Sequence, residues 1–279
     1  MSKEYSTNHT DQLYNRYLNL AINRFTWNNL PQGIESRKIE EMLVKTGRVM
    51  FFKENGVYIT LPAFGVGMYD IYNEPIHFNV VGNNYNKTID RDNGVIIRNN
   101  ATATNDHDDL LLFAERINEV EQTMDVNLNA QKTPYVILCD EKERLTFKNI
   151  LNQVSKFKYA IFGSKGLKYN NVDVLQTKAE FLLDKLQDTK NALMNELLTF
   201  LGINNSNTDK KERLIVDEVN SNNEFILVNI DHMFEERKKA VEEINKKYGL
   251  NISVEKREVA VNGSIHDRVK EDTSEQTNI

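Results

Sequence analysis

The residues in this 279-residue chain best suited to holding a metal ion are four in a row, Asp106-His107-Asp108-Asp109. Carboxylates and imidazoles are ordinary ligands of divalent cations. The other histidines are scattered and show no paired spacing. Capping of a helix by Asp106 or Asp108, with acidic residues favoured at a helix start, is the simpler interpretation. We therefore expect neither a metal nor a cofactor.

Other residue groups that could do chemistry lack the required spacing. Gly163-Ser164-Lys165-Gly166 resembles a phosphate-binding loop but lacks the G-x-x-x-x-G-K-[ST] spacing, so a turn is preferred. Gly65-Val66-Gly67 lacks the third glycine of a dinucleotide site and predicts a bend or bulge. Cys139, the one cysteine, ends an apolar run without a nearby histidine, which favours a buried structural role. We predict that the chain is not an enzyme.

The charge balance restricts how the chain could bind nucleic acid. It has 35 Lys+Arg against 41 Asp+Glu, a net charge of -6, and 40% hydrophobic residues. This composition is that of an ordinary globular protein and excludes a generally basic nucleic-acid coat. Contact with nucleic acid must then depend on a few local lysines. The start lacks the apolar core of a signal peptide, and no apolar run could span a bilayer, so we expect cytosolic synthesis and no membrane partner.

The first part of the chain predicts helices followed by a small sheet. Residues 1–10 are polar, and we expect a disordered arm. Helical spacing follows over 11–27 and again over 34–46. Short β-type runs separated by turn residues then predict an antiparallel sheet or barrel, with strands at 49–52, 57–61, 76–81 and 95–97.

Two long amphipathic helices, at about 108–130 and 178–201, enclose an insert that we expect to be α+β. Gly202 is a natural end for the second helix. The apolar stripes of both helices are satisfied either within one monomer or by neighbouring copies in a ring. The insert is expected to hold strands at 135–139, 159–162 and 172–175 and a short helix at 146–154.

The last part begins with a polar segment, 204–224, that contains Lys210, Lys211 and Arg213. A strand at 225–230, a helix at 231–247 and a strand at 252–261 are expected to follow. Residues 262–279 are polar and are expected to be disordered.

Three stretches carry a resemblance to a known family: Phe25–Pro31 (FTWNNLP), 127–134 (NLNAQKTP) and 184–204, continuing into 210–222. The chain resembles the portal proteins, also called upper collar or head–tail connector proteins, of small short-tailed picovirus-like bacteriophages. The similarity is strongest over 110–222 and weaker over 27–100.

This resemblance implies an α+β portal fold in a dodecameric ring, with long stem helices, a small α+β clip and a β-rich, SH3-like wing. The expected division is an arm at 1–10, wing at 11–107, stem at 108–133, clip at 134–177, stem at 178–202, channel loop at 203–223, wing at 224–261 and a tail at 262–279.

The resemblance also implies which side chains face DNA in the channel. Lys185 matches a channel-facing lysine, and Lys210 and Lys211 match a basic pair in the loop; Arg213 joins them. At another basic position of the family this chain has Gln176. Further candidates are Lys178, which lies near Gln176, and Lys190.

The expected role is a channel at one capsid vertex through which double-stranded DNA is packaged and ejected, in a virion assembled in the host cytoplasm. The implied partners are further copies of the chain, the packaging ATPase, the major capsid and scaffolding proteins and the lower collar or tail. Contact with a packaging RNA stays open, because Lys3 is the only basic residue before Arg16. The alternative is a tail or collar structural protein that does not conduct DNA during packaging.

Overall fold

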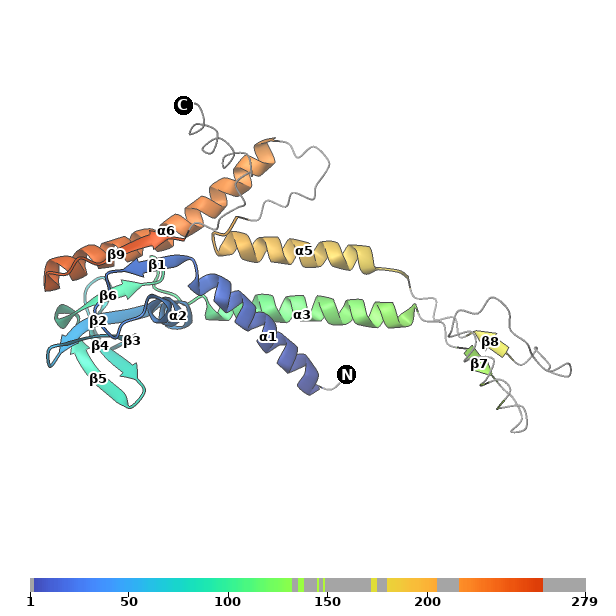
Figure 1. Cartoon of the computed structure of the whole chain (residues 1–279), viewed down its shortest axis with the longest axis horizontal. Helices are drawn as coiled ribbons and strands as arrows, with labels where there is room; N and C mark the ends of the chain where they lie inside the picture. Colours follow the sequence, from blue (N-terminus) through green and yellow to red (C-terminus); the bar gives the residue numbers. More distant parts are fainter. Residues whose placement is uncertain are drawn as a thin grey trace, which may run out of the picture. The chain divides into compact units, whose positions relative to one another are not determined.

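The computed structural model describes residues 3–131, 135–137, 145, 148, 172–174, 180–204 and 216–257 (Figure 1). The chain divides into two compact units: unit 1 consists of Met1–Asn118 and Leu193–Ile279, and unit 2 of Glu119–Ala192. The elements are α1 (Lys3–Ile22), β1 (Phe25–Asn28), α2 (Ser36–Thr46), β2 (Arg48–Glu54), β3 (Val57–Tyr69), β4 (Pro75–Gly82), β5 (Tyr85–Asp90), η1 (Arg91–Asn93), β6 (Gly94–Arg98), α3 (His107–Ala130), β7 (Tyr135–Ile137), β8 (Val172–Val174), α5 (Leu183–Phe200), α6 (Val216–Tyr248) and β9 (Ser253–Lys256).

A five-stranded antiparallel sheet in the order β5-β4-β3-β2-β6 forms the centre of unit 1. β2 is apolar throughout its middle because both of its faces are buried: Val49 and Phe51 belong to one core cluster, and Met50 and Phe52 to another. β3 pairs with β2 through its first half and with β4 through its second half. The register of β3 against β4 shifts between Val66 and Tyr69, in agreement with the bend or bulge predicted at Gly65–Gly67.

Segments from near both ends of the chain pair in a second sheet of unit 1. β1 runs antiparallel to β9, with Trp27 opposite Val254. Trp27 and Val254 belong to the same core cluster as Phe51 and the α6 residues Ala240 and Ile244. Unit 1 is therefore completed only when the C-terminal strand has paired.

A third apolar cluster joins α1 to those parts of α3 and α5 that belong to unit 1. Leu13 and Tyr17 of α1 pack there with Leu110 and Ile117 of α3 and with Leu197. Leu201 and Ile203, just beyond the end of α5, also pack against this cluster.

Gly202 ends α5 as predicted. Its φ of 70° lies in the left-handed region, and its backbone N–H and that of Ile203 return to the carbonyls of Thr199 and Leu198. These two hydrogen bonds end α5 at a position that has no side chain.

Five polar or charged side chains are buried together in unit 1. Arg237 of α6 binds both carboxylate oxygens of Glu40, at 2.9 and 2.8 Å, and the Oδ1 and backbone carbonyl of Asn99. Arg24 donates to Asp106 at 2.7 Å, and Asn99 donates to the other oxygen of Asp106, also at 2.7 Å. This network holds α2, α6, the residue before β1 and the residue after β6 against the start of α3.

Several expected elements differ from the observed ones. Residues 3–10, expected to be disordered, belong to α1, and the Thr10 hydroxyl accepts a hydrogen bond from Asn118 at 2.8 Å. The expected strand at 225–230 is part of α6, because Ile226, Ile230, Met233 and Arg237 are buried at helical spacing. The expected channel loop at 203–223 overlaps the start of α6 at Val216. α5 begins at Leu183, since Glu180–Leu182 are not helical.

In unit 2, β7 and β8 pair antiparallel, so two of the three strands predicted for the insert are present. The expected strand at 159–162, the expected helix at 146–154 and Cys139 fall, apart from the backbone at 148, outside the described residues. The division into arm, wing, stem, clip, channel loop and tail is otherwise a prediction.

Candidate nucleic-acid interface

The two long helices run antiparallel in unit 2 and are joined by polar contacts (Figure 1). Asn127 of α3 donates from Nδ2 to the carbonyl of Glu180 at 2.8 Å, and its Oδ1 accepts from the backbone N–H of Leu182 at 3.1 Å. One side chain thus satisfies backbone groups just before α5 begins. Nothing in the pattern of the sequence distinguishes Asn127 from its polar neighbours, and its role was not predicted.

Lys185 presents its amino group to solvent. Its side chain is 77% exposed, and it pairs with the equally exposed Glu180, whose Oε1 lies 3.6 Å from Nζ. Exposed pairs of this kind contribute little to stability. The amino group of Lys185 is therefore available to an anion that approaches α5.

Lys190 is placed differently from Lys185. Its Nζ lies 2.6 Å from the Oε1 of Glu121 on α3, and its side chain is 30% exposed. The pair joins the two helices. A role in contacting DNA would require Lys190 to leave Glu121, and this role stays a prediction.

The described helical and flanking residues of unit 2, 119–131 and 180–192, are acidic overall. They hold two lysines, Lys185 and Lys190, against six carboxylates, namely Glu119, Glu121, Asp125, Glu180, Asp184 and Asp188. A polyanion would be repelled by most of this surface and attracted at isolated points.

Apolar side chains also lie exposed on unit 2. Val126 is 63% exposed, Leu128 49% and Phe181 56%. Val126 and Leu128 lie on α3 and Phe181 just before α5, and contact with another chain would remove them from water.

The remaining predicted channel residues, Lys178, Lys210, Lys211 and Arg213, lie outside the described residues, as does Gln176. The structure therefore places two of the six candidates, and it separates them into one exposed amino group and one that joins two helices.

The four residues at 106–109, which were considered as metal ligands, make other contacts. Asp106 is buried and binds Arg24 and Asn99, so its side chain does not cap α3; Asn105 Oδ1 instead accepts from the N–H of Asp108 at 3.3 Å. His107 Nδ1 lies 2.6 Å from the Tyr14 hydroxyl. Burial raises the pKa of Asp109, and the charges of Asp106 and Asp108 add to that rise. In the described part of the chain, no group of three or more His, Cys, Asp or Glu could hold a metal ion.

A comparison with models of protein families identifies the family to which the chain belongs. The model of the family described as Phage Connector (GP10) matches residues 3–261. The chain belongs to this family. It is accordingly a structural protein of the phage virion, of the kind that connects head and tail.

A solved structure agrees with the family at the level of the fold. A chain in the structure titled "Portal and tail of native bacteriophage P68" matches with a TM-score of 0.55 at 18% identity, over 99% of this chain and 95% of that one. This match confirms the predicted portal fold. A chain in "Neck of empty GTA particle computed with C6 symmetry" matches with a TM-score of 0.49 at 10% identity, over 95% and 86% of the two chains.

Among the residues that the connector structure describes, no helix combines the length and apolar character needed to cross a membrane.

Proposed function

We propose that copies of this chain form a ring whose channel conducts double-stranded DNA into the capsid during packaging and out of it during infection. The observation that carries the proposal is the exposed amino group of Lys185 on a pair of long helices whose residues in unit 2 are mostly acidic among the charged ones. Membership in the Phage Connector family supplies the context, a connection between head and tail.

The charge pattern suits a duplex that must slide. DNA carries one negative charge for about every 1.7 Å of its axis, and each phosphate neutralised by a lysine adds to sequence-independent affinity. A fully basic wall would hold the duplex, whereas six carboxylates with one solvent-exposed lysine per copy weaken the grip. The proposed rings of Lys185, and of Lys210, Lys211 and Arg213 in the loop, supply intermittent contact.

The proposal includes a dodecamer, with the packaging ATPase, the shell and scaffolding proteins and the tail as partners of its outer surfaces. The exposed apolar residues Val126, Leu128 and Phe181 support contact between copies, because a single chain leaves them in water. The charge pattern supports passage of DNA, because isolated amino groups on an acidic surface attract a polyanion at a few points only.

Native mass spectrometry and negative-stain imaging of the purified chain at near-physiological salt test the ring. We expect a closed ring with a central hole. A stable monomer at micromolar concentration would overturn the proposal. The alternative, a tail or collar protein, is distinguished by when the chain joins the particle. A portal is present in proheads before DNA enters, whereas a tail protein is not.

The Lys185→Ala variant tests the channel. Rings should assemble as in the parent, while the slope of log binding constant against log salt for duplex DNA should become shallower by about 0.9 for each phosphate that a lysine no longer neutralises. Lys246→Ala, which removes another exposed lysine, is the matched control and should leave the slope unchanged. An equal slope in the two variants would show that Lys185 does not contact DNA in the channel.

The Lys210→Ala/Lys211→Ala variant tests the loop. Rings should form and package DNA, but less DNA should be retained once packaging stops. Retention equal to that of the parent would show that the pair does not hold DNA.

A further inference from the structure

Two Asn-Gly pairs in the described part of the chain lie in opposite surroundings. Asn55-Gly56 forms the turn between β2 and β3, and Asn93-Gly94 joins η1 to β6. Asparagine is one of the chemically labile residues of proteins. Where glycine follows it, no Cβ shields the next backbone nitrogen, so that nitrogen can reach the asparagine side chain. A third pair, Asn262-Gly263, lies outside the described residues.

The Asn55-Gly56 turn makes few contacts. The last pair of the β2–β3 ladder is Glu54 with Val57, so Asn55 and Gly56 lie beyond the ladder, and both are exposed. Their φ values of 49° and 87° are those of a two-residue hairpin turn. A Cβ added to Gly56 would have no atom within 4 Å. Among the described residues, the side chain of Asn55 and the N–H of Gly56 have no hydrogen-bond partner.

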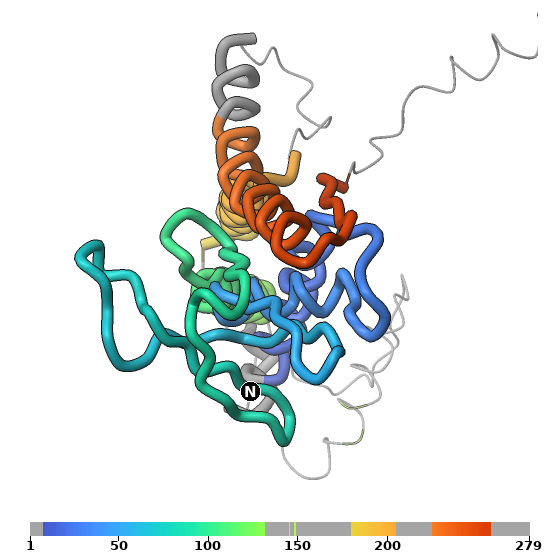
Figure 2. The backbone as a smooth tube through the Cα atoms, turned by 90° about the vertical axis from the view of Figure 1, so that its left-hand side faces the viewer, coloured from blue at the N-terminus to red at the C-terminus, as the bar shows by residue number. Residues whose placement is uncertain are grey.

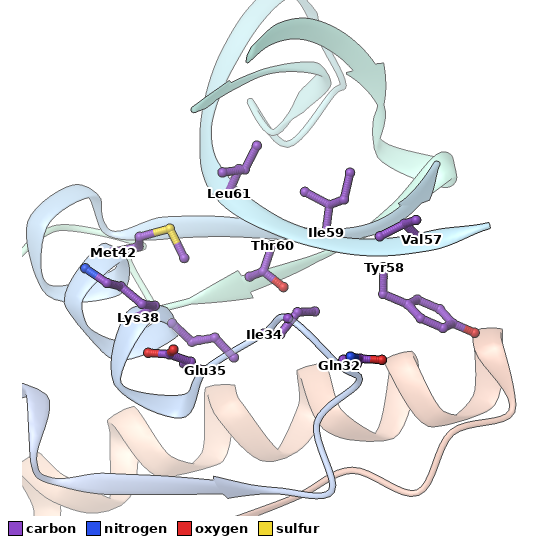
Figure 3. Close-up of a pocket in the computed structure, with 12 residues that line it drawn as sticks. Gln32, Ile34, Glu35, Lys38, Met42, Val57, Tyr58, Ile59, Thr60 and Leu61 are labelled. Carbon is purple, nitrogen blue, oxygen red and sulfur yellow. The ribbon is translucent and has the colours of Figure 1, made fainter. Parts of the chain in front are cut away.

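The chain next to this turn is also uncovered. Val57 is 58% exposed. Figure 3 shows Val57 and Tyr58 at one end of a pocket of about 400 Å³ between β3 and the segment that leads into α2. Figure 2 shows the turn in light blue where β2 passes into β3. A rotation of the backbone at Asn55 would therefore displace no packed side chain.

Asn93-Gly94 is held much more firmly. Gly94 is a buried residue of β6, and a Cβ added to it would lie 2.6 Å from Cγ of Met50. The Nζ of Lys247 donates to the carbonyls of Asp92 and Gly94, at 2.6 and 2.7 Å. Movement of the Gly94 nitrogen towards the side chain of Asn93 would break these contacts.

We propose that Asn55 is a site of spontaneous deamidation in the folded protein, whereas Asn93 is protected. The Gly56 nitrogen attacks Cγ of Asn55 and forms a C–N bond. The Cγ–Nδ2 bond breaks, and Nδ2 leaves as ammonia with the proton that the Gly56 nitrogen gives up, which leaves a cyclic imide. Water then opens the imide. Cleavage at Cγ gives aspartate, and cleavage at the backbone carbonyl of residue 55 gives isoaspartate. This inference does not depend on the proposed ring.

Either product changes the end of the β2–β3 hairpin. The new carboxyl is ionised near neutral pH. It lies beside Glu54, whose carboxylate accepts hydrogen bonds from Tyr85 and Lys87 of β5. Isoaspartate also adds a carbon to the main chain, which no longer matches the turn that sets Glu54 opposite Val57. A copy built into a particle is not replaced, so we expect the modified fraction to rise with the age of the particle.

Tandem mass spectrometry of peptides from the incubated full chain tests the site. Folded chain and chain unfolded in guanidinium chloride are kept side by side at mildly alkaline pH, and the acid formed at Asn55 and at Asn93 is followed over time. The ratio of the two rates in the unfolded chain is the reference, because the fold then protects neither pair. In the folded chain we expect this ratio to favour Asn55 by at least about tenfold more, since reaction at Asn93 requires local opening. A ratio equal to that of the unfolded chain would overturn the inference.

Substitution provides a second readout on folded protein. All chains carry Asn262→Gln, so that the third pair does not contribute. Ion-exchange chromatography of the incubated parent should show an early acidic form. Asn55→Gln should lack this form, because glutamine would have to close a larger ring, whereas Asn93→Gln should keep it. An acidic form that appears equally fast in Asn55→Gln would show that Asn55 is not the reactive site. The peptide measurement needs no variant and decides the question even if Asn55→Gln does not fold.

Discussion

Arg237 and Glu40 form a fully buried ion pair across 197 residues of sequence, with two hydrogen bonds of 2.9 and 2.8 Å. The Nε1 of Trp27 donates to the same Oε1 of Glu40 at 2.7 Å, and the guanidinium lies 4.2 Å from the ring centre of Phe25. The pair is fully hydrogen-bonded, so removing either partner leaves an unpaired charge in the core.

Replacing Glu40 by Leu should therefore destabilise unit 1 by about 3–5 kcal/mol, the usual result of leaving a buried charge without its partner. Urea unfolding at fixed protein concentration, followed by the fluorescence of Trp27, the one tryptophan, measures the change. The emission of the folded variant should also shift, because the indole loses its acceptor. Glu40→Leu/Arg237→Met should recover much of the loss. A double variant as unstable as the single one would mean that packing, not charge, is responsible.

Glu41 should make the free energy of unfolding depend on pH in the acid range. Hydrogen bonds from Lys45 and Lys38 lower its pKa from 4.5 to about 2. Because the pKa of Glu41 is lower in the folded chain than in the unfolded one, its ion pairs add to the free energy of unfolding. This added stability is complete above pH 4.5 and is lost as the pH falls towards 2. The unfolding free energies of the parent and Glu41→Gln should differ by a constant amount near neutral pH and converge in that acid window. A difference that persisted at pH 2 would contradict the ion-pair explanation.

Asn127→Ala should loosen the junction between α3 and the start of α5. The variant loses one donor and one acceptor that bind the backbone at Glu180 and Leu182, and a hydrogen bond of this kind contributes about 0.5–1.5 kcal/mol. Hydrogen exchange at the N–H of Leu182 should become faster, while amides of β2 should not change. Thr123→Ala on the same helix, which removes a hydrogen bond to the carbonyl of Glu119, is the control. Equal acceleration in both variants would show that Asn127 has no specific role.

Gly202→Ala should be among the most damaging single-methyl additions. A left-handed residue other than glycine costs about 1–2 kcal/mol. A Cβ at this position would also lie 2.7 Å from the Cβ of Ile230, and overpacking of a core costs about 1–3 kcal/mol. Thermal unfolding should show a loss of about 2–5 kcal/mol in total. Gly33→Ala, where φ is also positive but nothing lies within 4 Å, provides the control for the backbone cost alone.

Elements with strong periodicity could be predicted from the sequence, and so could the family. α3 was expected within a residue or two of its observed bounds, because Leu110, Phe113 and Ile117 repeat at helical spacing. β5 was missed because it is an edge strand whose alternating side chains are exposed, with Ile89 alone buried, so no apolar alternation marks it. The run at 225–230 is short and apolar, and such runs do not distinguish strand from helix.

The polar contacts depend on the fold and had no signal in the sequence. Glu40 lies beside Glu41 in α2, yet the first is buried against Arg237 and the second lies at the surface with lysines. Lys185 and Lys190 are about one and a half turns apart on α5, and whether each meets solvent or Glu121 is decided by the position of α3. The resemblance could indicate which lysines matter but not which amino groups are exposed.

The pairing of β1 with β9 has a consequence for synthesis. Phe25 and Lys256 face one another across this small sheet, so a ribosome must translate through residue 256 before the partner of the first strand exists. A chain cut short before β9 lacks that partner and leaves the apolar face of Trp27 uncovered. Copies that end before β9 therefore cannot complete this sheet, whereas copies that extend through Lys256 can.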